Sequence, residues 1–193
     1  GHKVWAFRMS YAGELGWDFH MPQAACRDVY DALFHAGKAH GIVDYGSFAM
    51  SVMRMEKGFK GAGELTNEVT LAEADVLRFA RSDKDYLGRD NTLKTDIPWI
   101  CAYLEIESDG VSDGHGGEAV LWQGQVVGST ASMAFGPTIG KILAFAYIKP
   151  EAAKPGTNLD VIIHGALRSA RVLAEPAYDP QSLKPRVDAR VLA

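Results

Sequence analysis

Cysteine is scarce in this sequence: only Cys26 and Cys101 occur among 193 residues. Two cysteines are too few for a disulfide scaffold, and no CxxC pair is present for zinc or thiol–disulfide chemistry. We therefore expect a reducing compartment, namely the cytoplasm or, in a eukaryote, the mitochondrial matrix. The longest apolar stretch, around Ile142–Ile148, is too short to span a bilayer, so we expect no membrane partner.

Runs of basic residues are also missing. The sequence has 20 Lys and Arg against 24 Asp and Glu, a formal net charge of -4. A nucleic-acid groove or a contact with anionic lipid requires a strong positive field. We therefore expect neither nucleic acid nor a membrane surface as a partner, and a small molecule is the better candidate.

Several motifs of common enzymes are absent. The sequence contains no GxGxxG after a strand, no GxxxxGK[ST] and no GxSxG, which argues against dinucleotide-binding, P-loop and serine-hydrolase chemistry. The segment Asp109–Glu118 carries carboxylates and one imidazole, but its spacing does not match a calcium loop and it offers no second histidine. Because Asp, Gly and Ser are also typical of a plain turn, we expect no metal there.

The first half of the chain reads as a hairpin followed by helices. Val4–Met9 and Trp17–Met21 alternate around a glycine-containing turn, which predicts a β-hairpin. Apolar residues at helical spacing predict one helix over Pro22–Ala36 and a second from about Gly46 to Lys57. The second helix places three apolar residues on one face that we expect to be core: Phe48, Val52 and Met55.

The second half is rich in short strands punctuated by glycine and proline, which predicts a small antiparallel barrel or sandwich. The expected strands are Trp99–Ser108, Glu118–Gln123, Gln125–Ser132, Ile142–Ile148, Asn158–Ile163 and Ser169–Leu173. A polar linker ending at Pro98 places the boundary between two domains, residues 1–94 and 95–193. The fold class is α+β: a partial α/β module of hairpin and helices, followed by a small antiparallel β-barrel.

One candidate binding site lies at the hairpin, in Tyr11–Trp17. The carboxylate of Glu14 could accept two parallel N–H bonds from an aminopyrimidine or guanidine-like edge, while nearby rings stack on the ligand. The alternative is a plain hairpin tip, with glycines making the turn and Glu14 facing water.

A second candidate is Arg54, which the sequence places between Met53 and Met55 near the end of the second helix. Apolar neighbours favour a partly buried guanidinium with a defined partner. The alternative is an ordinary ion pair.

Arg8–Trp17 resembles the R-x-[SG]-[YF]-x-G-E-x-G-[WF] stretch of the glycine-cleavage T-protein (aminomethyltransferase) superfamily. Its GELGW form looks most like the C-terminal folate-binding region of dimethylglycine and sarcosine dehydrogenases. Two departures from that subfamily are a proline missing from the TPLEAG-like segment and Ala177 in place of phenylalanine. Further similar segments follow in order: Met53–Lys60, Gly63–Thr66, Thr70–Ala74, Asp85–Asp90, Gly128–Ser132, Gly136–Lys141 and Glu175–Pro180.

The resemblance implies tetrahydrofolate-dependent transfer of an aminomethyl or methyl group from a methylamine donor, as in one-carbon metabolism and methylamine degradation. It implies tetrahydrofolate as the cofactor, with FAD only if a dehydrogenase domain is fused upstream. It also implies cofactor-binding roles: Glu14 at the pterin edge with Tyr11 beside it, and Arg54 on the wall of the folate site.

The family's catalytic aspartate lies in an earlier half of the folate domain, so no catalytic residue is assigned here. Neither Asp18 nor Asp44 is put forward as a replacement. The chain is expected to be the C-terminal portion of a module about twice as long, because a split domain leaves apolar faces uncovered. The missing N-terminal half is then a partner, and the portion alone is expected to be inactive.

Two other functions within the superfamily stay open. One is a non-catalytic folate-binding module serving iron–sulfur cluster maintenance; its relatives carry KGCYxGQE, and Lys57–Glu64 has no cysteine, which argues against it. The other is folate-dependent demethylation of a sulfonium substrate, whose distinguishing residues would lie in the absent half.

Overall fold

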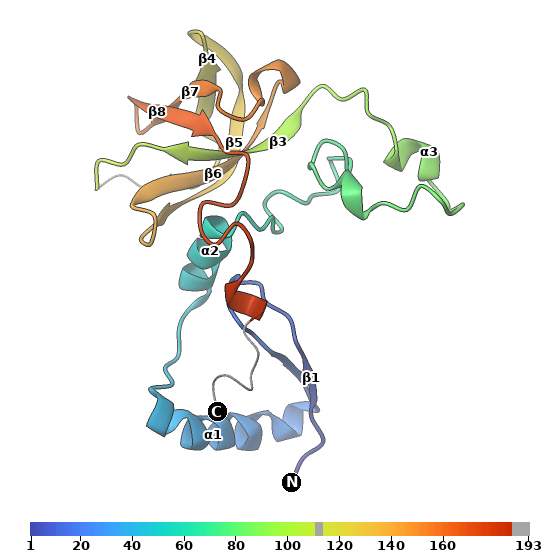
Figure 1. The fold of residues 1–193 in the computed structure, drawn as a ribbon, viewed down its shortest axis with the longest axis vertical. Coiled ribbons are helices and arrows are strands. Elements are labelled where there is room, and N and C mark those ends of the chain that lie inside the picture. The colour runs from blue at the N-terminus through green and yellow to red at the C-terminus, as the bar shows by residue number, and fades with distance from the viewer. Residues whose placement is uncertain (111–113, 187–193) are drawn as a thin grey trace. The chain divides into compact units, whose positions relative to one another are not determined.

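The computed structural model describes residues 1–110 and 114–186, and the chain divides into two compact units (Figure 1). One consists of Gly1–Met53 together with Gln181–Ala193, and the other of Arg54–Pro180. The first is called the hairpin unit below and the second the barrel unit. The domain boundary expected near residue 94 stays a prediction.

The hairpin unit begins with two short antiparallel strands, β1 (Trp5–Phe7) and β2 (Asp18–His20), in which Trp5 pairs with His20. The hairpin predicted from the sequence is thus confirmed, with strands shorter than expected and a connection over residues 8–17 that contains the expected glycines. A 3-10 turn at Gln23–Ala25 leads into the helix α1 (Cys26–Gly37). This is the first helix that the apolar periodicity predicted.

The second predicted helix is α2 (Ser47–Glu56). It stops before Gly58, whose φ of 67° is left-handed and whose amide donates to the carbonyl of Met55 at 2.9 Å, an arrangement that glycine tolerates best. Val52 and Met55 are buried as expected. Phe48 is not: 70% of its surface is exposed, because it lies in the first turn of α2, where no described element covers it.

Residues 59–99 contain little regular structure. The described elements are a 3-10 turn at Leu77–Phe79 and one short helix, α3 (Arg89–Thr92), which the sequence did not lead us to expect. This stretch leads into the first strand of the barrel.

Six antiparallel strands close into a barrel in the order β3-β6-β5-β4-β7-β8, which decides the choice between barrel and sandwich. The expected strands are all confirmed, with bounds β3 (Ile100–Ile106), β4 (Ala119–Trp122), β5 (Gln125–Gly136), β6 (Lys141–Ile148), β7 (Asn158–Ile163) and β8 (Ala166–Val172). The mixed fold with a small antiparallel barrel is therefore as the sequence predicted.

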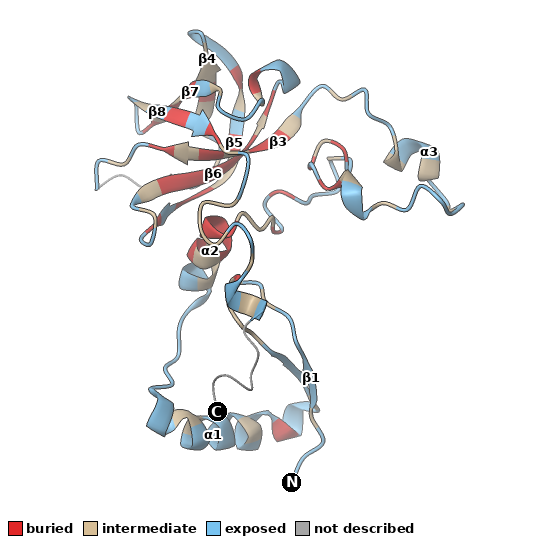
Figure 2. Ribbon diagram, in the orientation of Figure 1, coloured by how far each residue is buried: buried red, intermediate tan, exposed pale blue. Residues whose placement is uncertain are grey.

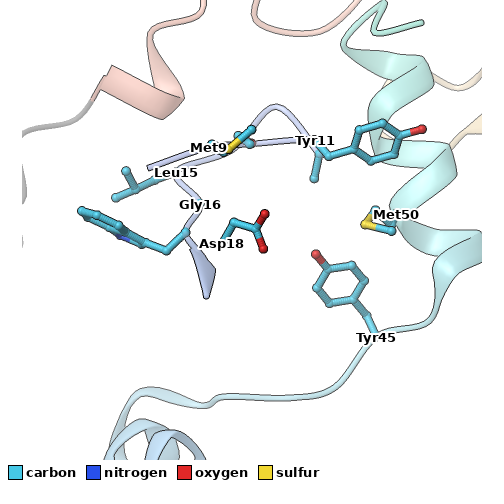
Figure 3. Close-up of a pocket in the computed structure, with 10 residues that line it drawn as sticks. Met9, Tyr11, Leu15, Gly16, Asp18, Tyr45 and Met50 are labelled. Atoms are coloured by element: carbon cyan, nitrogen blue, oxygen red, sulfur yellow. The ribbon is translucent and has the colours of Figure 1, made fainter. Parts of the chain in front are cut away.

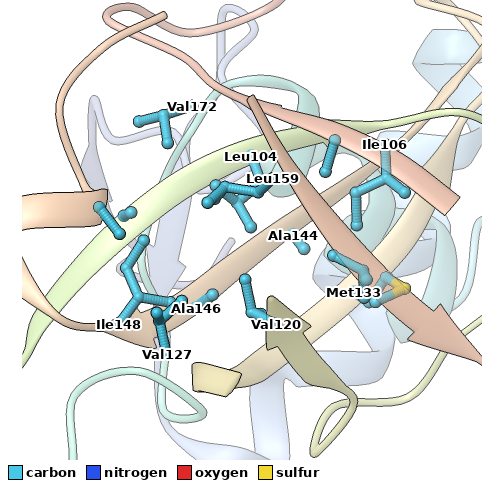
Figure 4. Close-up of a cluster of buried hydrophobic side chains, with 14 of the residues drawn as sticks. Leu104, Ile106, Val120, Val127, Met133, Ala144, Ala146, Ile148, Leu159 and Val172 are labelled. Carbon is cyan, nitrogen blue, oxygen red and sulfur yellow. The ribbon is translucent and has the colours of Figure 1, made fainter. Parts of the chain in front are cut away.

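Alternation along the strands fills the barrel interior. In β6, four residues at period two belong to one apolar core with residues of the other five strands (Figure 4): Ile142, Ala144, Ala146 and Ile148. The intervening Leu143 and Phe145 are buried as well, so both faces of this strand are covered. Buried residues concentrate in the barrel strands and the last turns of α2 (Figure 2).

Among the described residues, no helix has the length and apolar character needed to cross a membrane.

Candidate functional site

The hairpin unit contains a cavity of about 690 Å³, formed by the β1–β2 connection, the start of β2 and the residues around the beginning of α2. Aromatic, thioether and aliphatic side chains supply most of the lining (Figure 3). The lining residues are Met9, Ser10, Tyr11, Ala12, Leu15, Gly16, Trp17, Asp18, Tyr45 and Met50. The volume is in the range of small-molecule sites, about 300–1,000 Å³.

Glycines allow the β1–β2 connection to fold back on itself. A Cβ atom added at Gly16 would lie 2.7 Å from the carbonyl oxygen of Met9, so no larger residue fits without a backbone shift. Gly13 is buried and has a φ of 85°, a left-handed conformation that favours glycine. The two glycines of the GELG motif region therefore set the shape of the cavity wall.

Two polar groups face the cavity. Figure 3 shows the Asp18 carboxylate and the Tyr45 hydroxyl both turned toward its middle. The ring nitrogen Nε2 of His20 lies 3.3 Å from Asp18 Oδ2, on the same strand. A carboxylate beside aromatic walls is suited to a flat, polar ring system that donates hydrogen bonds.

The three cofactor-binding residues predicted from the sequence are placed differently. Tyr11 lines the cavity. Glu14 is partly buried on the same connection but is not among the lining residues. Arg54 belongs to the barrel unit. The cofactor-binding roles of all three residues stay predictions.

Asp18 is the cavity residue that sequence reasoning passed over. Its signal in the sequence is its position directly after GELGW, at the first residue of β2. From the sequence alone, Asp18 is considered and set aside as a substitute for the family's catalytic acid, and it is not assigned as a binding residue.

Arg54 has the buried, defined partner that its methionine neighbours predicted. Only 5% of its surface is exposed, and its Nη1 lies 2.9 Å from Glu64 Oε2. The same nitrogen donates to the carbonyl of Phe59 at 3.0 Å, and Nη2 donates to Ser132 Oγ at 3.4 Å. Among the described residues, the Arg54 Nε–H has no acceptor, so one donor of this buried guanidinium makes no hydrogen bond.

Glu64 holds this cluster together, and the sequence analysis gave it no role. Its Oε2 accepts from the Gly61 amide at 2.5 Å, its other carboxylate oxygen accepts from the Ser132 hydroxyl, and its carbonyl accepts from Tyr147 at 2.6 Å. A fully buried carboxylate is tolerated only when it is paired and hydrogen-bonded in this way. The cluster joins the end of α2 to β5 and β6.

A second buried ion pair fixes the segment Glu175–Pro180. Lys57 is fully buried, and its Nζ lies 2.9 Å from Asp179 Oδ2 and also donates to the Asp179 carbonyl. The Tyr178 amide donates to the Glu56 carbonyl at 2.9 Å. These contacts hold the PAYDP segment against the last turn of α2.

The described residues contain no group of three metal-ligating side chains. In the turn cluster 109–118, the Glu118 carboxylate accepts from the backbone amides of His115 and Gly116, both at 2.9 Å, which is a turn-stabilising role. Positions 111–113 of that cluster lie outside the described residues. Burial raises the pKa of the Cys101 thiol to about 12, so this thiol stays protonated at neutral pH and is a poor nucleophile.

Two family models match most of the chain. Residues 1–84 match the GCVT N-terminal domain, and residues 101–179 match the glycine cleavage T-protein C-terminal barrel domain. Among curated proteins, the chain is 32% identical to mouse dimethylglycine dehydrogenase over 90% of this chain and 20% of that protein. It is 34% identical to mouse sarcosine dehydrogenase over 94% of this chain and 21% of that protein.

Shorter relatives are also similar. A probable aminomethyltransferase of Pyrococcus abyssi is 27% identical over 94% of this chain and 52% of that protein. The crystal structure of the glycine cleavage system aminomethyltransferase T from Bartonella henselae shares the fold, with a TM-score of 0.81 at 18% identity over 91% of this chain and 50% of that one.

The chain thus spans about half the length of the aminomethyltransferases and about a fifth of the dehydrogenases. The matched models cover the hairpin cavity and the barrel, and the resemblance first seen in Arg8–Trp17 extends over nearly the whole sequence. The chain belongs to the glycine-cleavage T-protein (aminomethyltransferase) superfamily.

Proposed function

We propose that this chain supplies part of a tetrahydrofolate site in an enzyme of one-carbon transfer, with the hairpin cavity as the part that holds the pterin ring. The observation that carries the proposal is the cavity itself, in which aromatic walls surround one inward-facing carboxylate. The membership of the superfamily supports the same function. The donor is proposed to be a methylamine or aminomethyl compound.

The residues present fit a reduced pterin. The aminopyrimidine edge of such a ring offers two parallel N–H donors, which a carboxylate can accept together. Asp18 is the carboxylate that faces the cavity, and Tyr11 and Trp17 provide ring surfaces for stacking. When bound, tetrahydrofolate supplies the amine nitrogens that receive the one-carbon unit.

In this proposal the chain's own residues bind and orient. Asp18 fixes the edge of the ring, and the aromatic walls restrict its plane and exclude water. Holding two reactants in a productive geometry supplies a large share of the rate enhancement in transfers between bound partners. The acid that stabilises positive charge during transfer is expected from a segment outside this chain.

That segment is also the proposed partner of the hairpin unit. All residues of β1 and β2 are exposed, and α1 has no buried residue. Large apolar side chains with 40–75% of their surface exposed include Trp5, Phe19, Leu33 and Val43. A segment covering this face would bury them, and FAD would enter only with a dehydrogenase domain in such a longer polypeptide.

The compartment stays a prediction from the sequence. The two dehydrogenases quoted above are named as mitochondrial proteins, which agrees with the mitochondrial matrix as one of the two expected locations.

Titration of tetrahydrofolate into the full-length polypeptide tests the proposal. Asp18→Asn keeps the size of the side chain and removes its charge, so we expect binding to weaken about tenfold or more. Glu14→Gln, on the same connection but outside the cavity lining, is the matched control and is expected to change binding less. Glu151→Gln, on an exposed turn of the barrel unit, is expected to have no effect.

A larger effect of Glu14→Gln than of Asp18→Asn would restore the assignment made from the sequence and overturn the one made from the cavity. If neither substitution changes the affinity, the pterin lies elsewhere.

A further inference from the structure

The barrel unit has a cavity of its own, of about 310 Å³, on the outside of the barrel. It lies where the loop after Glu64 meets the strands β5 and β6 and the residue before β3. Its lining residues are Glu68, Val69, Glu73, Trp99, Gly128, Ser129 and Tyr147. None of them belongs to the hairpin unit, so this cavity is built independently of the proposed folate site.

Aromatic rings provide two of its walls. Trp99 directly precedes β3 and has 41% of its surface exposed. Tyr147 lies in β6, paired across the ladder with Ser129 of β5. The Tyr147 hydroxyl donates to the Glu64 carbonyl at 2.6 Å, which fixes the ring and leaves its surface as a wall.

Carboxylates provide the charge of the cavity. The Oε2 atom of Glu73 accepts from the amide and the hydroxyl of Thr70 at 2.8 and 2.9 Å, so the orientation of this side chain is set. Its backbone is tied to the barrel, because its carbonyl accepts from the Cys101 amide at 2.7 Å. Within the described part of the chain, neither Glu73 nor Glu68 forms an ion pair, and no lysine or arginine lines the cavity.

The floor of the cavity is backbone. A Cβ atom at Gly128 would lie 2.0 Å from the Tyr147 carbonyl oxygen, so only glycine is tolerated at this approach of β5 to β6. Glycine leaves this part of the cavity free of side chain.

A concave site that combines aromatic faces with unneutralised carboxylates is complementary to an organic cation. The face of a tryptophan or tyrosine ring attracts ammonium groups, and a carboxylate neutralises their charge. An anion would be repelled by both glutamates, and a neutral apolar ligand would gain nothing from their charge. We propose that this barrel cavity binds a small alkylammonium cation.

Titration of the intact protein with tetramethylammonium chloride, followed by calorimetry, tests this site. We expect saturable binding that weakens about tenfold in Glu73→Gln and in Trp99→Leu, since each removes one of the two attractions. Glu68→Gln changes an exposed carboxylate for which the described residues show no ion pair, and we expect a smaller loss. Glu151→Gln, an exposed carboxylate outside the cavity, is the matched control and is expected to bind as the parent does.

Neutral tert-butanol, which has a similar shape, is expected not to saturate the site. Equal binding of tert-butanol and tetramethylammonium, or no saturable binding at all, would overturn the proposal. So would retained affinity in both Glu73→Gln and Trp99→Leu. Loss of binding in Asp18→Asn alone would place the cation in the hairpin cavity instead, and would equally refute a site on the barrel.

Discussion

The two units of this chain differ in how they use their apolar residues. The barrel interior is closed by residues from all six strands, and Leu104, Val120 and Ile163 have no exposed surface. In the hairpin unit, the residues of both strands are exposed, among them Trp5 and Phe19, and so is Tyr45. The barrel unit therefore has a finished core, whereas the hairpin unit has an uncovered apolar face.

Closure explains the contrast. A barrel pairs every strand on both edges, so its inward residues meet one another without help from other elements. Two short strands and one amphipathic helix cannot do the same, since a single hairpin with a helix buries too little surface. The hairpin unit is thus the part of the chain whose apolar face is left for another segment to cover, whereas the barrel unit closes its own core.

Hydrogen exchange should show the largest difference between the units. We expect amides of β6 to exchange only through global opening, at a free energy of about 5 kcal/mol or more. Amides of β1 and β2 should open at about 2 kcal/mol or less, because few buried contacts hold them. Mass spectrometry of exchanged peptides measures both, and equal protection of the two would contradict the comparison. In a longer polypeptide that covers the hairpin unit, protection of β2 should rise while that of β6 stays unchanged.

Removal of one partner of the buried Arg54–Glu64 ion pair should lower the stability of the barrel unit strongly. Arg54→Met leaves the Glu64 carboxylate buried without its cation, which is expected to lower the free energy of unfolding by about 3–5 kcal/mol. Urea denaturation measures this loss.

Lys141→Gln is the matched control, because Lys141 pairs with Glu107 at 2.6 Å on the exposed surface and should contribute about 1 kcal/mol or less. A double substitution, Arg54→Met with Glu64→Gln, should recover part of the loss. Equal effects at the buried and the exposed pair would show that burial does not govern these interactions.

Truncation of a leucine should also lower the free energy of unfolding by different amounts in the two units. Leu104→Ala, in the centre of β3, is expected to cost about 2–5 kcal/mol through lost burial and a cavity. Leu33→Ala, in α1 with 40% of its surface exposed, should change stability by about 1 kcal/mol or less. The two free energies of unfolding come from the same denaturation series, and a Leu33 effect as large as that of Leu104 would mean that the helix is already fully packed.

A smaller, pH-dependent effect on the free energy of unfolding is expected from substitution of Glu118. Burial raises the pKa of this carboxyl, but hydrogen bonds from the Thr130 hydroxyl and from backbone amides, including those of His115 and Gly116, outweigh it and hold the pKa below its usual 4.5. A lowered folded-state pKa stabilises the protein above the unfolded-state pKa, and this contribution is lost as the pH falls through the folded-state value.

Glu118→Gln should therefore be less stable than the parent at pH 7, by less than about 1 kcal/mol because solvent screens this partly exposed carboxylate, and the difference should shrink as the pH falls below 4.5. Thermal or urea unfolding over this range measures it. Glu105→Gln provides a comparison on β3, and a difference at Glu118 that does not shrink at all as the pH falls below 4.5 would exclude the ionised carboxylate as its cause.

Local pattern was enough to predict much of the fold. Alternation along 142–148 and 158–163 predicted strands close to their true bounds, and helical spacing predicted α1 and α2. Ordered motifs predicted the superfamily. Phe48 shows where this reasoning ends: its spacing matches Val52 and Met55, but the turn that carries it has nothing packed on it.

The candidate site was predicted only in part. Glycine spacing and aromatic residues pointed to the β1–β2 connection, which lines the cavity and includes Tyr11, while the binding role itself stays a prediction. Which acidic residue faces that cavity depends on how the connection folds back at Gly16, and this geometry favours Asp18 over Glu14. Likewise, the sequence predicted a partner for Arg54, but only the folded chain identifies it as Glu64.

The sequence by itself determined the strand and helix segments, the superfamily and the presence of a polar, aromatic hairpin, because these depend on spacing between near neighbours. The tertiary structure alone decided barrel closure, the partner of Arg54, the burial of Glu64 and Lys57, and the direction of each carboxylate. Those features depend on contacts between residues far apart in the chain, and the free energy of burying a charge is set by the partners that such contacts supply.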